Sequence, residues 1–327
     1  MSSLKELGEL GVIQVMERSL GTSARDAIGF GDDVSAIKLT DDRLAVVKTD
    51  MLVASTDVPP GMTMKQAARK AVVANVSDLA AKGVKPYAGL VALGLPKSLA
   101  KHDVQDIAKG LSGAAREYQF PLLGGDTNES KDLVISIALF GLADSRRIIL
   151  RSGAKVGDII AVSGDFGSAC AGLRAILDRR IRPHKLPQDL AKAVYHPNAE
   201  LDLGVRLAAS GAVTASIDSS DGLAWSLHEL SRMSKVGMHV AHVPISKAAR
   251  EFAARHGLQG LDLALYGGEE YRLIVTIKPT QLSTAQRAAH GQLTPIGVVT
   301  KRTYGLRLFM DGEDAEIEMR GWEHFRN

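Results

Sequence analysis

The sequence predicts a mixed α/β (α+β) fold divided into two domains, and three observations carry this prediction. The chain has 327 residues, of which 45% are apolar, so it can build two hydrophobic cores. Strand-like apolar runs alternate with stretches of helical periodicity along most of its length. A charged connector at 143–147 separates two such series. We therefore expect an N-terminal domain over residues 1–145 and a C-terminal α/β domain over residues 146–327.

In the N-terminal half, short runs rich in valine, isoleucine and leucine predict strands, because branched apolar side chains suit a pleated, half-buried surface. These runs lie at 44–47, 89–93 and 133–139. Two longer stretches, at 65–82 and 104–118, place apolar side chains at helical spacing and predict helices.

The C-terminal half continues the alternation of strands and helices. A strand-like run at 158–164 opens it. The elements expected after it are helices at 168–178 and 200–209, a strand at 213–217, a helix from Leu223, and strands at 271–277 and 296–299. The sequence has no internal repeat, heptad pattern or low-complexity segment.

Charge and composition exclude several classes of protein. The 40 basic residues against 37 acidic ones leave a net charge of +3, which indicates neither a membrane nor a nucleic acid as partner. No uncharged apolar run approaches the length that spans a bilayer. The single cysteine, Cys170, excludes an intrachain disulfide framework, and the N-terminus lacks an apolar signal segment. We expect a cytoplasmic protein.

Basic residues gather at one place in the sequence, and we interpret this cluster as a solvated loop. Its members are Arg179, Arg180, Arg182, His184 and Lys185. The cluster follows an Ala/Leu-rich helical stretch, where cations near a helix C-terminus are ordinary. Aromatic residues are only 5% of the chain and do not interleave with it, so the stacking part of a single-strand binding surface is missing.

Aspartates stand at five places beside glycine or apolar residues. The segments are Gly31-Asp32-Asp33, Lys48-Thr49-Asp50, Asp78 within 74–81, Gly124-Gly125-Asp126-Thr127 and Asp218-Ser219-Ser220-Asp221-Gly222. Hard oxygen ligands gathered in such settings suit Mg²⁺ that carries the phosphates of a nucleotide. The sequence therefore predicts a metal-phosphate site.

The first two segments differ in how well ordinary structure explains them. Asp32 and Asp33 precede a strand-like run, and taken alone they are better explained by a Gly-Asp turn that opens a hairpin. Asp50 is expected to end an apolar strand, where an unpaired carboxylate is costly to desolvate. A ligand role is therefore favoured for Asp50.

Asp78 lies in the middle of an expected helix, so it cannot cap either end. Asn75 and Lys82 fall on its face at helical spacing. Buried carboxylates pair with a cation about as often as with a metal. An internal ion pair with Lys82 and a metal-ligand role therefore remain equal alternatives.

The last two aspartate segments also have alternatives. The two glycines before Asp126 predict either a turn in which the carboxylate bonds nearby backbone, or a backbone that approaches phosphate with Asp126 on a metal; adjacent glycines favour the second. Further along, a strand passes into a helix, so Ser220 or Asp221 can serve as N-cap. Capping explains one of these residues, whereas phosphate on the helix amides with metal on Asp218 and Asp221 explains them together.

Three other residues are candidates for chemistry. Glu269 follows two glycines and is either a contact for a polar substrate group or a turn acid. Arg151 is either a phosphate clamp or, more commonly, a surface arginine. Cys170 is a poor nucleophile, because its apolar helical stretch has no histidine or cation nearby. No Walker A sequence or protein-kinase motif set occurs, so any nucleotide is bound by a different arrangement.

Taken in order, these segments resemble a superfamily of ATP-using enzymes that includes aminoimidazole ribonucleotide synthetase, selenophosphate synthetase and the hydrogenase maturation carbamoyl-dehydrating protein. The branch they resemble most is thiamine-monophosphate kinase. The matching segments span nearly the whole chain and are Gly29-Phe30-Gly31-Asp32-Asp33, Thr49-Asp50-Met51-Leu52-Val53, Asn75-Val76-Ser77-Asp78-Leu79-Ala80-Ala81, Gly124-Gly125-Asp126-Thr127, Arg151-Ser152-Gly153-Ala154, Asp218-Ser219-Ser220-Asp221-Gly222-Leu223, Gly267-Gly268-Glu269-Glu270-Tyr271 and Gly321-Trp322-Glu323-His324-Phe325. Each motif alone is weak, whereas eight in the family's order are strongly specific.

The resemblance implies an enzyme that transfers the γ-phosphoryl group of ATP to thiamine monophosphate, giving thiamine diphosphate and ADP. Because two polyanions must meet in line, several Mg²⁺ ions are expected, and no side-chain nucleophile is required. By position, the implied metal ligands are Asp33, Thr49, Asp50, Asp78, Asp126, Asp218 and Asp221. The implied ATP contacts are Tyr118, Gly125, Asp126, Arg151 and Ser220, and the implied thiamine contacts are Glu269 and Trp322.

The chain departs from the family's pattern at three positions. Many relatives have histidine shortly after the Thr-Asp-Met-Leu-Val motif; this chain has none there, and we expect Asp57 to replace it as a substrate contact. Lys48 stands where serine is common, so either its carbonyl serves as a ligand or one metal site is changed. Arg272 reverses the charge of a glutamate close to Glu269.

The resemblance also implies a homodimer, in which the N-terminal sheet pairs with that of a second subunit near the active-site cleft. Two alternatives to the kinase remain. One is a sister synthetase that activates an amide or carbonyl oxygen, although the reactive cysteine of the hydrogenase maturation branch and the N-terminal cysteine of the selenophosphate branch are absent. The other is a non-catalytic nucleotide-binding protein, for which loss of metal ligands would be the expected signature.

Overall fold

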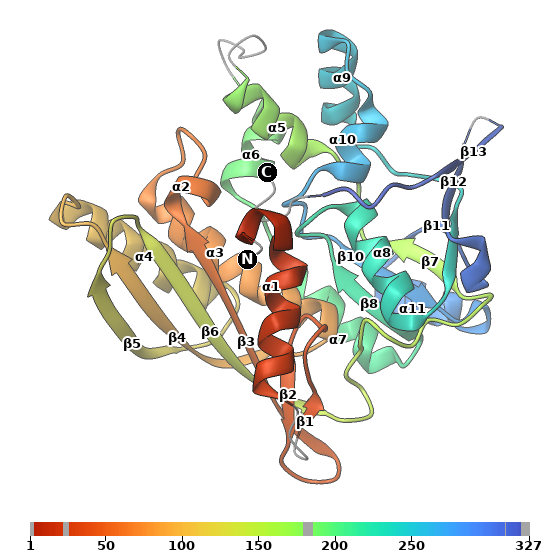
Figure 1. Ribbon diagram of the computed structural model, residues 1–327, viewed down its shortest axis with the longest axis horizontal. Coiled ribbons are helices and arrows are strands. Elements are labelled where there is room, and N and C mark those ends of the chain that lie inside the picture. The colour runs from red at the N-terminus through yellow and green to blue at the C-terminus, as the bar shows by residue number, and fades with distance from the viewer. Residues whose placement is uncertain (1–2, 22–25, 179–185, 311, 322–327) are drawn as a thin grey trace.

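The computed structural model describes residues 3–21, 26–178, 186–310 and 312–321. They form two mixed β-sheets with helices packed between and around them (Figure 1). This arrangement confirms the expected α/β class. Among the described residues, no helix combines the length and apolar character needed to cross a membrane.

The N-terminal sheet has six strands in the order β1-β2-β3-β6-β4-β5. Its strands are β1 (Asp26–Ile28), β2 (Ser35–Lys38), β3 (Arg43–Val53), β4 (Pro86–Leu95), β5 (Leu122–Glu129) and β6 (Val134–Asp144). Neighbouring strands are antiparallel except for the β4–β5 pair, which is parallel. The helices of this half are α1 (Leu4–Leu20), α2 (Ala54–Asp57), α3 (Met64–Lys82) and α4 (Lys101–Glu117).

The C-terminal sheet has seven strands in the order β13-β12-β9-β11-β7-β10-β8. Its strands are β7 (Ile159–Val162), β8 (Val213–Asp218), β9 (Gly237–Val240), β10 (Leu273–Ile277), β11 (Thr294–Thr300), β12 (Leu306–Met310) and β13 (Glu313–Glu316). The α-helices of this half are α5 (Ser168–Leu177), α6 (Gln188–Tyr195), α7 (Leu201–Ser210), α8 (Leu223–Ser234), α9 (Lys247–His256), α10 (Gly260–Tyr266) and α11 (Leu282–Ala288).

Helix α3 is the central element, and both of its ends are specified by sequence. Thr63 and Gln66 form a capping box at its start, and Gly83 adopts the left-handed conformation that ends it. Most of its side chains are buried, because it packs against α4, against α7 and against the strands β3, β6 and β8. A helix enclosed in this way carries small apolar residues on nearly every side, and α3 is rich in alanine and valine.

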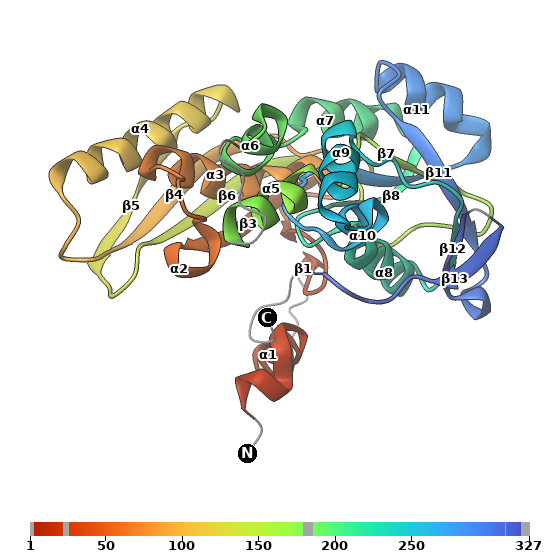
Figure 2. The same ribbon diagram turned by 90° about the horizontal axis from the view of Figure 1, so that it is seen from above.

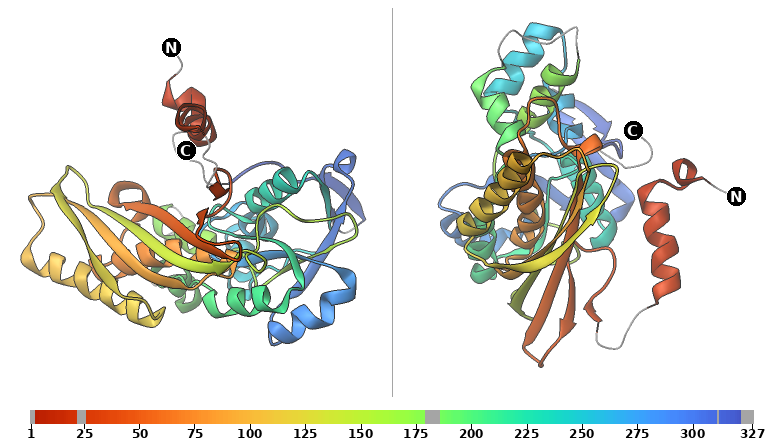
Figure 3. Two further views of the ribbon diagram at one scale, coloured as in Figure 1. Left: turned by 90° about the horizontal axis from the view of Figure 1, so that it is seen from below. Right: turned by 90° about the vertical axis from the view of Figure 1, so that its left-hand side faces the viewer.

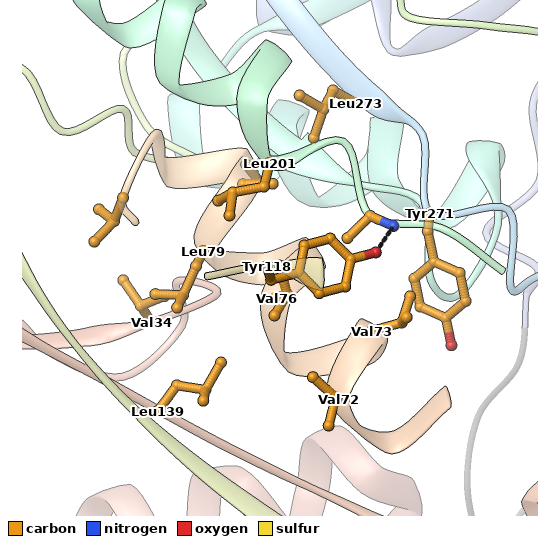
Figure 4. Packing of buried hydrophobic residues seen from close by; sticks show 14 of the residues in the cluster. Val34, Val72, Val73, Val76, Leu79, Tyr118, Leu139, Leu201, Tyr271 and Leu273 are labelled. Atoms are coloured by element: carbon orange, nitrogen blue, oxygen red, sulfur yellow. Dashed lines mark hydrogen bonds between the residues drawn. The ribbon is translucent and has the colours of Figure 1, made fainter. Parts of the chain in front are cut away.

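One hydrophobic core extends across both halves of the chain. Strand β10 shows how, because its side chains alternate between two faces. Leu273, Val275 and Ile277 join the core that surrounds α3, whereas Ile274 joins a second core beneath α8. Figure 4 shows Tyr271 beside Val73 of α3, Leu273 near Leu201, and the hydroxyl of Tyr118 hydrogen-bonded to the segment before α7.

Helices α3 and α4 cover one face of the N-terminal sheet. The other face, which we call the outer face, is not covered by them. Helix α1 stands apart from the body on this side, away from α4 (Figures 2 and 3). Strand register puts alternate side chains of β3, β4 and β6 on the outer face. Large apolar side chains are exposed there, namely Val47, Met51, Leu90, Leu123 and Leu142.

Most elements predicted from the sequence are confirmed, one local expectation is wrong, and one of the alternatives for Asp126 is excluded. Strand β3 does not end at Asp50 but continues to Val53, paired with β6 along its whole length. The glycines before Asp126 do not form a turn; they lie within β5, at the edge of the sheet. The pattern of small and polar residues in β5 concealed a strand, because its backbone pairs with β4 without burying its side chains. The predicted basic cluster at 179–185 lies outside the described residues.

A domain boundary near residue 145 remains our proposal. Strands of the first sheet end at Asp144 and those of the second begin at Ile159. The shared core, however, makes the two halves interdependent in packing.

The close approach of α3 and α7 gives a stability prediction. A Cβ on Gly204 of α7 would lie 1.9 Å from the carbonyl oxygen of Ala80 in α3, a contact that requires the helices to separate. Gly204→Ala should therefore lower the free energy of unfolding by about 1–3 kcal/mol, the usual cost of overpacking. Chemical denaturation followed by circular dichroism measures this change.

Gly113→Ala is the matched control, because Gly113 also lies inside a helix, α4, and a Cβ there meets no atom within 4 Å. Alanine favours helix over glycine, so this variant should be as stable as the parent or slightly more so. Equal stability of the two variants would contradict the proposed close packing of α3 on α7.

Candidate active site

Three buried aspartates from separate parts of the chain meet at one point. Asp33 precedes β2, Asp78 lies within α3, and Asp218 ends β8. One carboxylate oxygen from each lies within 4.8 Å of the others. Oxygen ligands about 2.0–2.6 Å from a common Mg²⁺ or Ca²⁺ ion are separated by up to about 5 Å, so this geometry suits one divalent ion.

Asp33 is held by two cationic side chains. Its Oδ1 accepts a hydrogen bond of 2.8 Å from Arg151 Nε, and Arg151 Nη2 contacts the same oxygen. Its Oδ2 lies 2.8 Å from Lys82 Nζ. Burial alone would raise the pKa of Asp33, but the Arg151 and Lys82 charges outweigh burial and lower that pKa to about 2. Asp33 is therefore ionised at any physiological pH.

Lys82, the last residue of α3, is completely buried. Its ammonium lies 2.7 Å from Asp32 Oδ1 and donates a 2.8 Å hydrogen bond to the carbonyl oxygen of Ser216 in β8. The ion pair between Lys82 and Asp78 that was one alternative from the sequence is thus not formed. Lys82 instead connects the Asp32-Asp33 loop to strand β8.

Asp78 pairs with Lys48 of strand β3, whose Nζ lies 2.5 Å from Asp78 Oδ2. Burial and the neighbouring carboxylates of Asp218 and Asp33 raise the pKa of Asp78 well above its usual range, while Lys48 opposes them. The negative charges of the neighbouring carboxylates, Asp78 first among them, favour the charged ammonium and raise the pKa of Lys48, although its burial acts in the opposite direction. Crowded acids of this kind require a cation to remain ionised.

Asp218 and Asp221 differ from the other two, because they have no such cation. Asp218 accepts hydrogen bonds from Ser77 Oγ at 2.6 Å and from Ser220 Oγ at 3.2 Å. Burial and the charge of Asp33 raise the pKa of Asp218 to about 6. Burial and the charge of Asp218 raise the pKa of Asp221 to about 7. No lysine or arginine in the described part of the chain forms an ion pair with either residue.

A cavity of about 320 Å³ borders this group of acids on one side. Asp50, Ser220 and Asp221 are among its lining residues, and Ser220 donates a hydrogen bond to Asp218 of the cluster. The rest of its wall is apolar with a few polar groups, and includes Met51, Pro59, Pro60, Leu173, Tyr271, Asp57, Lys70 and Glu269. A mostly apolar wall with a few charged groups is typical of a site for a small organic molecule.

Lys70 of α3 organises the polar groups of this cavity. Its ammonium contacts Glu269 Oε1 and donates a 2.8 Å hydrogen bond to the carbonyl oxygen of Asp57. The Asp57 carboxylate itself accepts from the amide of Val53 at 2.7 Å, so it also holds the turn that opens α2. Glu269 has φ +66°, a strained value for a residue with a side chain.

A second cavity, of about 710 Å³, borders the acids from the outer face. Asp32, Asp33, Lys48 and Thr49 line it on the polar side. Its apolar wall comes from the strands of the sheet and includes Val47, Leu90, Leu123 and Phe140. Two cavities therefore reach the same acidic cluster, one through Asp50 and Asp221 and the other through Asp32 and Asp33.

Several residues predicted for the site lie away from the acidic cluster or outside the described residues. Tyr118 is buried, and its hydroxyl donates to Asn198 Oδ1 and accepts from the amide of Ala199, both at 3.0 Å (Figure 4). Asp126 and Gly125 are exposed on β5. Trp322 lies outside the described residues. Their predicted contacts with ATP, metal or thiamine remain predictions.

Sequence reasoning did not assign roles to Lys70 and Ser77, although the sequence contains a signal for both. They stand seven residues apart on α3, and Asp78 follows Ser77. Residues at this spacing share one face of a helix. Buried polar residues along one face of an Ala/Val-rich helix indicate that this face serves a site as well as a core.

Comparisons with known proteins agree with this geometry. Residues 31–143 match the family model "AIR synthase related protein, N-terminal domain". The thiamine-monophosphate kinase of Nitrosopumilus maritimus is 37% identical over 99% of this chain and 100% of its own length. The thiamine-monophosphate kinase of Pyrococcus abyssi is 34% identical over 90% of both chains.

Solved structures are similar along the whole chain. One, described as "AaThiL complexed with AMPPCP and TMP", superposes with a TM-score of 0.85 at 27% identity and covers 99% of both chains. The thiamine monophosphate kinase of Aquifex aeolicus gives a TM-score of 0.79 at 26% identity, over 94% of this chain and 98% of its own. With 37% sequence identity to a relative over nearly its entire length, this chain belongs to the thiamine-monophosphate kinase family.

Proposed function

We propose that this protein transfers the γ-phosphoryl group of ATP to the phosphate of thiamine monophosphate, forming thiamine diphosphate and ADP. The observation that carries the proposal is the meeting of Asp33, Asp78 and Asp218 where two cavities border one acidic cluster. A donor and an acceptor that both bear phosphates need such a meeting point. The relatives named thiamine-monophosphate kinase and the structural neighbour described with AMPPCP and TMP support this choice of substrates.

Mg²⁺ fits the chemistry of the donor set. Asp218 is buried and Asp221 is partly buried, and desolvation together with a neighbouring carboxylate raises the pKa of each. We propose Asp33, Asp50, Asp78, Asp218 and Asp221 as ligands, with Thr49 and Asp126 as further ones. Mg²⁺ bound there would offset the repulsion between the phosphates of the two substrates.

We assign thiamine monophosphate to the cavity lined by Asp57, Glu269 and Tyr271. Its apolar wall suits the rings of thiamine, and the Glu269 carboxylate suits the positive thiazolium. Trp322 is a further proposed contact. The attacking phosphate oxygen is already ionised, so the protein needs to position it and no general base is required.

We assign ATP to the outer-face cavity and its entrance. Its apolar wall can take the adenine, and its polar side leads to the acids. Of the ATP contacts predicted from the sequence, we propose Gly125, Asp126 and Arg151 for this cavity. Ser220 lines the other cavity, and Tyr118 is buried in the core around α3, so neither is part of this assignment. Arg151 has a second task, because its guanidinium also holds Asp33 in the cluster.

A second copy of this chain is the proposed partner at the outer face. Exposed large apolar side chains gathered on one sheet face mark an interaction surface, and strand β5 leaves one edge of the sheet unpaired within the described chain. A homodimer formed there buries both. A cytoplasmic location, with no membrane or nucleic acid as partner, remains a prediction.

The metal assignment predicts the effect of charge removal. Asp78→Asn and Asp218→Asn should each lower the turnover rate by about 100-fold or more, since metal ions supply several kcal/mol of transition-state stabilisation. ³¹P NMR of thiamine diphosphate formed from ATP and thiamine monophosphate measures the rate. Asp41→Asn is the control, because Asp41 is a fully exposed carboxylate paired only with Lys38. Full activity of the first two variants would refute the assignment.

The homodimer gives a second prediction. The variant Leu142→Asp places a charge on the outer face at a residue that does not line the ATP cavity, and it should be monomeric by light scattering at micromolar concentration, while the parent is a dimer. Val156→Asp is the control, because Val156 is comparably exposed but far from the outer face in sequence and sheet. A parent protein that is itself monomeric would exclude the dimer.

The raised pKa values of Asp218 and Asp221, about 6 and about 7, predict how pH affects the metal-free protein. The unfolded carboxyl groups release their protons at about pH 4, whereas the folded protein retains them up to about pH 6 and 7. Stability therefore falls as pH rises from about 4 to about 7, by on the order of 3 kcal/mol per group. Mg²⁺ binds the ionised form and should raise the melting temperature more at pH 8 than at pH 6. An equal effect at both pH values, measured by scanning fluorimetry, would contradict this.

A further inference from the structure

Lys48 occupies an unusual place for a lysine, because it reaches into the acidic cluster from a strand. It lies on β3 opposite the buried Leu139 of β6, so its side chain faces α3 and not the solvent. Its ammonium is 2.5 Å from Asp78 Oδ2, and the two side chains are only 18% and 10% exposed. Asp78 is one of the three residues whose oxygens are spaced for a divalent ion.

The carboxylates of the cluster divide into two groups by their partners. Asp33 contacts two side-chain cations, Arg151 and Lys82, and Asp78 contacts one, Lys48. Asp218 receives only hydroxyl hydrogen bonds, from Ser77 and Ser220. Lysine and arginine side chains thus neutralise the carboxylates that come from the β2 loop and from α3. Among the described residues, no such side chain forms an ion pair with the carboxylate at the end of β8.

We propose that the Lys48 ammonium takes the place of one divalent ion at Asp78. A divalent ion held by Asp78 together with Asp33 and Asp218 would lie within a few ångströms of this ammonium, and like charges at that separation in a buried site repel strongly. The remaining divalent ions then bind on the side of Asp218, Asp221 and Asp50, and Asp78 contributes to them only through Oδ1, because Oδ2 is paired with Lys48. The inference rests on the proposed function for the identity of these ions.

A lysine in this position has a definite chemical consequence. An ammonium carries one charge, has no open coordination position and is covalently fixed, so it stabilises Asp78 without binding phosphate oxygen as a metal does. The chain therefore needs fewer divalent ions to complete its site than a chain with a small, uncharged residue at position 48.

The test counts bound Mn²⁺ by electron paramagnetic resonance, with Mn²⁺ alone as probe and no nucleotide or thiamine present. Lys48→Ser should bind one more Mn²⁺ per chain than the parent, because it frees Asp78 and supplies a hydroxyl. Lys48→Arg retains the charge and should keep the parent's count. Lys38 lies on the neighbouring strand β2, is exposed and pairs with Asp41. Lys38→Ser should also leave the count of bound Mn²⁺ unchanged.

An unchanged or lower count for Lys48→Ser would overturn the proposal, provided that its circular dichroism matches that of the parent. Lys48→Gln, which keeps most of the side-chain length, replaces the serine variant if that protein does not fold, and the same gain of one ion is expected. The count is independent of catalysis. A parent that binds Mn²⁺ but forms no thiamine diphosphate would refute the proposed function while leaving this inference in place, and a parent that binds no Mn²⁺ would refute both.

Discussion

The structure depends on a lysine that has no contact with solvent. Lys82 joins three segments that are distant in sequence, since its ammonium contacts Asp32, Asp33 and the carbonyl oxygen of Ser216. A buried charge is tolerated only when it is paired and hydrogen-bonded, so none of these partners can be removed without leaving an uncompensated group. The loop before β2, the end of α3 and the strand β8 are therefore fixed relative to one another, and they are the segments that carry Asp33, Asp78 and Asp218.

Helix α3 links this electrostatic arrangement to the packing of the whole molecule. One face supplies Val72, Val76 and Leu79 to the core, and polar positions along the same helix supply Lys70, Ser77 and Asp78 to the site. The position of the site residues is thus set by close packing with Gly204 of α7 and with the strands on either side. Rigid elements hold functional groups more accurately than loops do, and α3 is such an element.

The sequence predicted the overall fold class and the central helix from local patterns, and it predicted the aspartates that meet from the resemblance of the ordered motifs to a family. Helical periodicity over 65–82 and the carboxylates near strand ends are visible without knowledge of tertiary structure. The partners of Asp78 were not predictable in the same way. Lys82 lies four residues away and Lys48 thirty, and only the packing of β3 against α3 decides between them. Strand β5 was missed because it contributes backbone pairing and no buried apolar face.

The sharing of one core by both sheets also bears on how the chain folds as it is synthesised. The N-terminal half emerges first, yet the side of α3 that faces α7 and β8 has no cover until those segments follow. Until then its alanine and valine side chains, together with the charged end at Lys82, remain in contact with water. The first half of the nascent chain can therefore complete its core only after the segment through β10 has left the ribosome, and exposed apolar surface of this kind is what chaperones bind.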